Sequence, residues 1–301
     1  EYTVTYSTVN GDEGTTKVYT CIDNTKPTLT ISYKTKGQEV IPQGKDVSYY
    51  NSRIEVIATV IDKNFDPDNT ENALIIYKND SSVANVSFGD WEPVEDKDAT
   101  YSCTAILDED GTYNVAGYAL DYAKNKSDEF IGESFTIDTI APKVELEVTN
   151  SDVKNGKYYS DSRIAVITVT EVNFDQNDVT KDIYSKVGNP KEEAWTHDGD
   201  KHTLKITFDE DGVYSLKFSC RDKAGNSSNT VEESEFVIDK TAPTISVNYD
   251  NNDVKNGMYY KAARTAEIGV TDLSFDASGV IVNNSQDVDL NNVPAQSGFT
   301  N

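Results

Sequence analysis

Several short sequence motifs recur in one fixed order along this chain, about every 100 residues. This period is the size of a domain and is too long for a solenoid repeat. Each copy opens with Asp-x-x-x-Pro, at residues 23–27, 138–142 and 239–243. A tyrosine pair, an arginine and a Phe-Asp ending follow at residues 48–66, 155–175 and 256–276. The repetition constrains the fold because every copy must share one architecture and bury its own core.

Each copy reads as short strands separated by polar turns. In the second copy the segments that alternate between apolar and polar residues, or are rich in β-branched residues, are 143–148, 163–170, 182–187, 203–208, 213–220 and 235–238. No segment keeps a period of 3.6 residues. This pattern predicts an all-β fold made of tandem immunoglobulin-like β-sandwiches joined end to end.

A turn motif sharpens the fold prediction. Asp-Glu-Asp-Gly-x-Tyr occurs twice and places Tyr113 and Tyr214 at the entry of a late strand. This arrangement resembles the tyrosine corner of immunoglobulin-like sandwiches, in which the hydroxyl bonds to backbone a few residues upstream. Two residues later, where antibody domains have a cysteine, stand Val115 and Leu216. Aliphatic packing is therefore expected in place of the disulfide between the sheets.

Taken in order, the motifs Asp-x-Thr-x-Pro, Tyr-Tyr-x-x-x-Arg, Asn-Phe-Asp, Asp-Gly-x-Tyr and Asp-x-Ala-Gly-Asn resemble the bacterial immunoglobulin-like repeats of large surface proteins of Gram-positive gut bacteria. The resemblance covers essentially the whole chain. It implies a protein that is secreted or wall-attached and acts as an adhesin, a stalk or a binder of host proteins.

The repeat register also predicts domain boundaries. Two whole repeats are expected at residues 24–138 and 139–239. Residues 1–23 are expected to be the last strands of a preceding repeat, and residues 240–301 the first strands of a further one.

Composition excludes several classes of partner. The formal net charge is −25 and the pI is about 4.3, so nucleic acid and anionic lipid surfaces would be repelled. No apolar run is long enough to cross a membrane as a helix, and no membrane insertion of this segment is expected. Three cysteines, an odd number, cannot form a closed disulfide framework.

No enzyme is predicted. The two histidines, His197 and His202, fall in one copy only, and no nucleophile, phosphate loop or paired histidine motif accompanies them. Carboxylates are abundant, but no pair is distinguished by its surroundings.

Acidic residues at the repeat junctions suggest a cation site. A junction aspartate and the loop after the second strand can approach each other, and their oxygens suit Ca²⁺. In the second repeat the expected ligands are Asp138, Glu171, Asn173 and Asp175. The alternative stays open that each aspartate only caps a turn before proline.

Four residues are candidates for ligand binding. Trp91 and Trp195 occupy similar places in their repeats and would anchor a partner if exposed, or cover the ends of their own cores if buried. Tyr159 and Arg163 would share one face of a continuous strand and act as a surface clamp. The alternative is that both residues have only a structural role in the fold of the repeat.

The sequence therefore predicts a non-enzymatic, modular stalk or adhesin region at the bacterial cell surface or secreted from it. The expected partners are a host extracellular protein or glycan and the neighbouring repeats of the same chain. Two alternatives stay open, namely repeats that bind a host protein directly, for example an immunoglobulin, and a carbohydrate-binding module.

Overall fold

The computed structural model describes residues 2–69, 71–79, 82–150, 152–154, 156–255 and 259–281. It divides into two compact units, one of Glu1–Ile140 with Lys223–Asn226, the other of Ala141–Asp222 with Ser227–Asn301. Each unit contains one complete β-sandwich. The fold class predicted from the sequence is confirmed, since the described residues form strands and one 3-10 turn, η1 (Ala277–Gly279).

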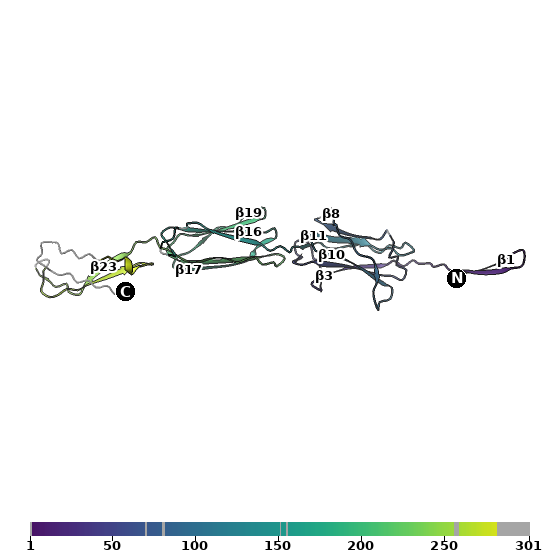
Figure 1. Ribbon diagram of the computed structural model, residues 1–301, viewed down its shortest axis with the longest axis horizontal. Helices are drawn as coiled ribbons and strands as arrows, with labels where there is room; N and C mark the ends of the chain where they lie inside the picture. The colour runs from purple at the N-terminus through teal and green to yellow at the C-terminus, as the bar shows by residue number, and fades with distance from the viewer. Residues whose placement is uncertain are drawn as a thin grey trace. The chain divides into compact units, whose positions relative to one another are not determined.

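The first sandwich consists of two sheets, which Figure 1 shows as two layers, with β3 and β10 in one and β8 and β11 in the other. One sheet has the order β4 (Gln38–Val40), β3 (Thr28–Thr35), β6 (Ile54–Ile61), β10 (Thr100–Leu107) and β9 (Glu92–Pro93). The other has the order β5 (Tyr49–Tyr50), β13 (Phe135–Ile137), β11 (Gly111–Tyr118), β7 (Ala73–Lys78) and β8 (Ser82–Val83), with β12 (Phe130–Ile131) also on β11.

The second sandwich repeats this plan. One sheet has the order β14 (Lys143–Val148), β16 (Arg163–Thr170), β20 (Lys201–Phe208) and β18 (Lys191–Glu192), with β19 (Thr196–Asp198) also on β20. The other has the order β15 (Tyr158–Tyr159), β22 (Val231–Ile238), β21 (Gly212–Asp222) and β17 (Phe174–Lys186). The strand predicted at 182–187 is thus longer and begins at Phe174, with an irregularity in its pairing between Phe174 and Val179.

Alternation along the central strands builds each core. Residues of β6 and β16 are buried at every second position, as expected for strands whose inner face meets a second sheet. Phe208, Leu216 and Phe218 are among the fully buried side chains of the second core. Burying one such side chain stabilises a fold by about 1.5–3 kcal/mol.

Two shorter groups of strands flank the sandwiches in sequence. Among the described strands, β1 (Tyr2–Ser7) pairs with β2 (Glu13–Val18) alone. β23 (Thr244–Tyr249) pairs with β26 (Ala266–Thr271), and β24 (Val254–Lys255) with β25 (Tyr259–Tyr260). The side chains of β1 and β23 are exposed along their whole length, because no second sheet covers them within the described chain.

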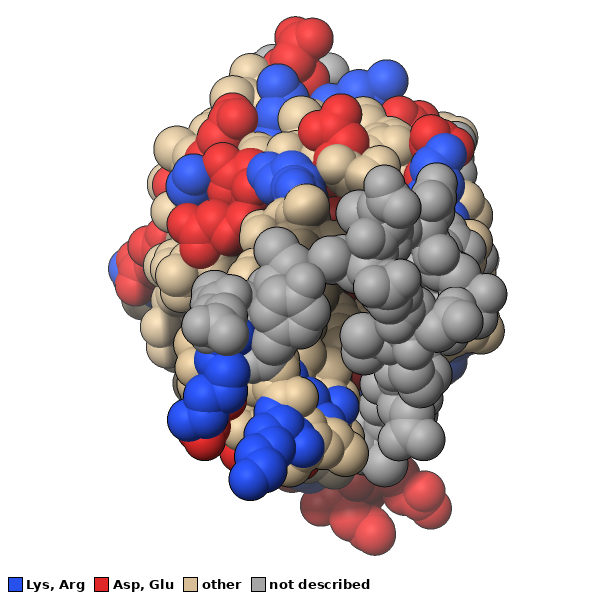
Figure 2. Space-filling view, turned by 90° about the vertical axis from the view of Figure 1, so that its left-hand side faces the viewer, with Lys and Arg blue, Asp and Glu red and all other residues tan. Residues whose placement is uncertain are grey.

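The cysteines contribute no covalent link. Cys21, Cys103 and Cys220 are free, the first exposed and the other two buried in the cores. Burial raises the pKa of the Cys103 thiol to about 12. The surface carries charges of both signs, and on the face drawn in Figure 2 small groups of Asp and Glu lie beside Lys and Arg.

The tyrosine corner is present in both sandwiches. The Tyr113 hydroxyl donates a 2.9 Å hydrogen bond to the Glu109 carbonyl, and the Tyr214 hydroxyl a 2.9 Å bond to the Glu210 carbonyl. Both rings are buried, and burial raises the pKa of each phenol. The hydroxyl therefore fixes the turn to the strand that follows it.

Replacing Tyr113 or Tyr214 by phenylalanine is expected to lower the free energy of unfolding of its own repeat by about 1 kcal/mol, because the hydrogen bond from the buried tyrosine to the turn is lost. Urea unfolding followed by tryptophan fluorescence measures the change. Tyr184→Phe is the matched control, since Tyr184 is exposed and its hydroxyl makes no hydrogen bond among the described residues. Equal stability of all three variants would contradict the prediction.

Candidate metal centre in the first repeat

Three aspartates from separate segments meet at one end of the first sandwich. Asp23 precedes β3, Asp62 follows β6 and Asp121 lies in the turn after β11. Each makes a local turn in which its Oδ1 accepts a backbone N–H: from Thr25 at 2.9 Å, from Asn64 at 2.7 Å and from Asn125 at 2.8 Å. These short-range bonds are why aspartate suits each position, and they hold the carboxylates in place.

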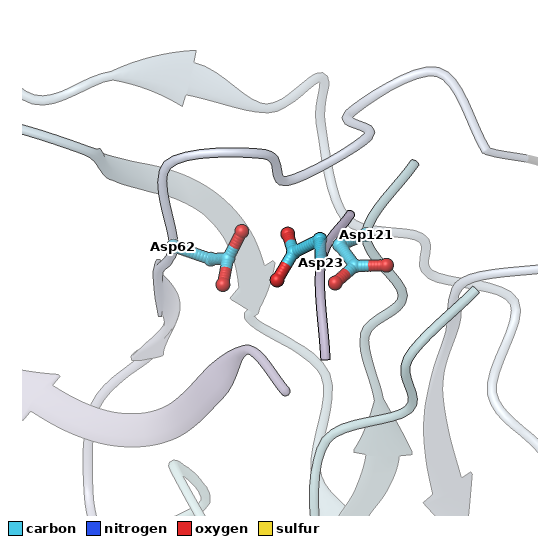
Figure 3. A group of neighbouring side chains, drawn as sticks. All are labelled: Asp23, Asp62 and Asp121. Carbon is cyan, nitrogen blue, oxygen red and sulfur yellow. The ribbon is translucent and has the colours of Figure 1, made fainter. Parts of the chain in front are cut away.

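The three carboxylates offer oxygens that all lie within 4.8 Å of one another. Figure 3 shows the Asp23 carboxylate between those of Asp62 and Asp121. Two carboxamides hold the group, with Asn64 Nδ2 2.6 Å from Asp23 Oδ2 and Asn125 Nδ2 2.8 Å from Asp121 Oδ2. Among the described residues, no lysine or arginine forms an ion pair with any of the three.

Electrostatics differ between the members of this group. Burial, together with the neighbouring charges of Asp121 and Asp23, raises the pKa of the Asp62 carboxyl above its ordinary value, against the opposing effect of the Asn64 N–H. The pKa of Asp23 is lowered by hydrogen bonds from the Thr25 backbone and the Asn64 side chain. Like charges brought this close oppose each other, and a cation between them would remove the opposition.

The donor set fits a hard cation. The three ligand groups are carboxylates, whose oxygens suit Ca²⁺ or Mg²⁺, whereas Zn²⁺ prefers histidine and cysteine. Asp121 is completely buried and Asp62 nearly so. A cation held here would tie the segment that enters the sandwich to the loops after β6 and β11.

The second repeat brings one predicted ligand, Glu171, close to a carboxylate that was not predicted, Asp222. Glu171 and Asp222 are buried and have oxygens within 4.8 Å of each other. The Glu171 carboxylate accepts the backbone N–H of Asn173 at 2.8 Å. Asp138 belongs to the other compact unit, where it is buried and accepts the N–H of Ile140 at 3.2 Å. Asp175 lies outside this group of carboxylates, because it accepts both N–H groups of Asn177 within its own turn.

Sequence reasoning missed Asp121 and Asp222 as candidate ligands. Both begin the Asp-x-Ala-x-Asn turn, which by itself indicates only a hairpin. The asparagine of that turn is the signal that could have found them, because in both repeats it also contacts the junction. Asn125 Nδ2 donates to the Asp23 carbonyl at 3.1 Å, and Asn226 Nδ2 donates to the Asp138 carbonyl at 2.9 Å.

The tryptophans cover the ends of their own cores. Trp91 packs against Phe65 with ring centroids 5.0 Å apart, and Trp195 packs against Phe174 at 5.0 Å. Both are partly exposed. Their shared position makes them structural counterparts in the two repeats.

The predicted surface clamp of Tyr159 and Arg163 requires a correction. The two residues are not on one strand, because Tyr159 ends β15, which pairs in parallel with β22, while Arg163 begins β16 in the other sheet. Arg163 is buried, lies 4.1 Å from the Tyr159 ring centroid and 4.5 Å from that of Phe236, and donates to Glu233 at 2.7 Å. Its guanidinium packs between the two sheets and is not accessible to a surface ligand.

A model of a known protein family matches part of this chain. Residues 201–283 match the family of bacterial Ig-like domains (group 3). The match runs from β20 to beyond β26, so it joins the late strands of one repeat to the early strands of the next. The chain is also similar to the structure of FdeC, described as a broadly conserved Escherichia coli adhesin, at 12% identity and a TM-score of 0.32, covering 82% of this chain and 73% of that one.

A search of curated proteins finds no match to the sequence. Within the described residues, no helix is long and apolar enough to cross a membrane.

Proposed function

We propose that this chain is a segment of a non-enzymatic, modular stalk at a bacterial cell surface, which presents or contributes to adhesion to host ligands. The observation that carries the proposal is the repetition of one sandwich with hardly any linker: β13 ends at Ile137, β14 begins at Lys143, and only residues 138–142 lie between. Such a connection spaces modules along a chain. The match to bacterial Ig-like domains supports the same role.

The proposed modules are whole repeats at 24–138 and 139–239, with parts of neighbouring repeats at 1–23 and 240–301. The order of motifs favours large surface proteins of Gram-positive gut bacteria, secreted or attached to the wall. Catalysis has no part in this proposal, which rests on the repeated sandwich and on the family match.

Force spectroscopy on the full chain tests the stalk role. Each sandwich of roughly 100 residues should unfold as a separate event that releases about 33–36 nm of chain. Two such events of similar length are expected. A single gradual extension at low force would contradict a series of independent modules that resist force.

Direct binding of a host protein, for example an immunoglobulin, is the second candidate function. Its support is the presence of exposed large apolar side chains such as Tyr184 and Val187 on the second sandwich. Capture from serum and mucus with the immobilised chain, analysed by mass spectrometry, separates the two functions. If one defined protein is retained in near-stoichiometric amount, the repeats bind a host protein directly and the passive-stalk function is wrong.

We also propose that Asp23, Asp62 and Asp121 hold a hard divalent cation, such as calcium, that stiffens the entrance of the first sandwich. The approach of three carboxylates without a basic partner among the described residues favours this role. The bound cation should therefore add to the stability of the first repeat.

A further inference from the structure

The arginine of the first repeat lies one residue out of register with the other two. Arg163 stands four positions after Tyr159, and Arg264 four after Tyr260, but Arg53 stands only three after Tyr50. Because successive side chains of a strand face opposite sides, a shift of one residue moves the arginine from the inner to the outer face. Accordingly, β6 begins with a fully buried isoleucine, Ile54, where β16 begins with the buried arginine.

Other residues fill the space that this shift leaves. In the second repeat the Arg163 guanidinium covers Phe236 and pairs with Glu233. In the first repeat the Tyr33 ring packs edge-on against Phe135 at 5.4 Å. Gly132 stands as far before Phe135 as Glu233 stands before Phe236, and a Cβ there would lie 2.6 Å from the Tyr33 hydroxyl. The first repeat therefore offers Arg53 neither the ring nor the carboxylate that holds Arg163.

Arg53 and two lysines line a pocket on the surface of the first sandwich. A cavity of about 280 Å³ on the first sandwich is lined by Lys34, Lys36, Gly37, Ser52, Arg53 and Glu55. Arg53 is exposed, and its guanidinium makes no hydrogen bond or ion pair among the described residues. The Lys34 ammonium is equally unpaired there, although Lys34 lies opposite Glu55 in the ladder of β3 and β6.

The third cationic residue, Lys36, lies in a turn with an unfavourable backbone conformation. Lys36 and Gly37 form the two-residue turn between β3 and β4, with φ values of +50° and +77°. Such turns prefer asparagine followed by glycine, because a lysine with positive φ is sterically disfavoured. The Lys36 ammonium donates to Asn51 Oδ1 at 2.8 Å, which holds it beside the pocket. Lys36 thus occupies a strained backbone position, and its ammonium is fixed by Asn51. A strained residue that is held in place in this way suggests that its charge has a function.

The chemistry of the pocket selects its ligand. Three cations attract an oxyanion, and Arg53 offers the planar fork that suits a carboxylate or sulfate. The Glu55 carboxylate lines the same pocket and can accept a hydrogen bond from a sugar hydroxyl. The chain's net charge of −25 repels polyanions and strongly acidic peptides, so a ligand with one negative charge is favoured. The volume lies just below the range of pockets for drug-sized ligands and suits one sugar ring.

We propose that this pocket of the first repeat, formed by Lys34, Lys36 and Arg53 with Glu55, binds a single acidic sugar residue that carries one carboxylate or sulfate, at the end of a glycan. The site is independent of the stalk role, because a spacer module keeps its function whether or not the pocket is occupied.

Saturation-transfer NMR and calorimetry on the full chain test the site, with N-acetylneuraminic acid, glucuronic acid and N-acetylglucosamine 6-sulfate as probes. At least one acidic sugar should bind, and N-acetylglucosamine should not. Arg53→Gln and the double variant Lys34→Gln, Lys36→Gln should each weaken binding about tenfold or more, since each removes charge-assisted hydrogen bonds. Lys186→Gln, a loss of one exposed charge on the second repeat, is the control and should bind as the wild type does.

Three results would overturn the proposal. One is the absence of binding of every acidic sugar at millimolar concentration. Another is equal binding of the neutral sugar, or equal binding by wild type and Arg53→Gln. The third is tighter binding of a short glutamate peptide, which would assign the pocket to acidic protein segments instead. The substituted side chains are on the surface, so circular dichroism and the melting temperature should confirm that all variants fold.

Discussion

Arg163→Ala is expected to destabilise the second repeat by about 2–3 kcal/mol, whereas Arg53→Ala should change the first repeat by less than about 0.5 kcal/mol. The two arginines occur in the same sequence phrase, but only Arg163 is buried. Its removal leaves a cavity between Tyr159 and Phe236 and deprives Glu233 of its partner. Glu233 retains 28% exposure of its side chain, so the loss is smaller than for a fully buried ion pair.

Each repeat has its own fluorescent reporter for this comparison. Trp91 and Trp195 are the only tryptophans, and each packs within one sandwich. In a Trp91→Phe background the emission of Trp195 follows the second repeat alone, and the reverse background follows the first. A loss of about 2–3 kcal/mol in a domain of this size lowers the melting temperature by roughly 10–20 °C.

Arg163→Met separates packing from charge. Methionine restores part of the apolar volume but not the ion pair, so its melting temperature should fall between those of the alanine variant and the wild type. Equal effects of Arg53→Ala and Arg163→Ala on their repeats would contradict the difference in burial that defines the two sites.

Calcium is expected to raise the melting temperature of the first repeat, followed by Trp91. A ligand that binds only the folded state at a concentration about 100 times its Kd stabilises it by about 2.7 kcal/mol. EDTA should reverse the effect, and Asp121→Asn should abolish it because Asp121 is the fully buried member of the group. An identical melting curve in calcium and in EDTA would exclude the cation site.

Asp62→Asn distinguishes a cation site from a merely structural turn. The folded state raises the pKa of Asp62, so its ionised form disfavours folding, and this cost is present in full once the pH exceeds the folded pKa. At neutral pH in EDTA the variant should therefore be at least as stable as the wild type, while in calcium it should lose the stabilisation. As the pH falls below the ordinary carboxyl range, the difference in EDTA should disappear. Lower stability of the variant in EDTA would instead assign Asp62 to the turn alone.

Much of the fold followed from local patterns. Alternation identified the central strands, and the Asp-Gly-x-Tyr turn placed Tyr113 and Tyr214, because both signals arise within a few consecutive residues. The environment of Arg163 did not follow. The step from β15 to β16 crosses between sheets within three residues, and a two-residue strand such as β15 is too short to show a period.

The metal centre was only partly predictable for a related reason. Asp23, Asp62 and Asp121 come from three distant segments, and their approach depends on how the two sheets stack. Asp121 also lies in a turn whose sequence is fully explained by its hairpin geometry, so nothing local marked a second role. The shift of Arg53 by one position can be read from the sequence. Only the structure shows that Ile54 is buried in its place, which puts Arg53 on the surface.

The aliphatic side chains that replace the disulfide between the sheets have a consequence for how the sandwiches respond to reducing conditions. A disulfide in a small extracellular domain typically contributes about 2–4 kcal/mol, but only while its surroundings keep it oxidised. Here Val115 and Leu216 are buried in the two cores, and Cys103 and Cys220 are single buried thiols. Reductants therefore have no bond to break, and the sandwiches keep the same stability in oxygen-free, thiol-rich surroundings as in air.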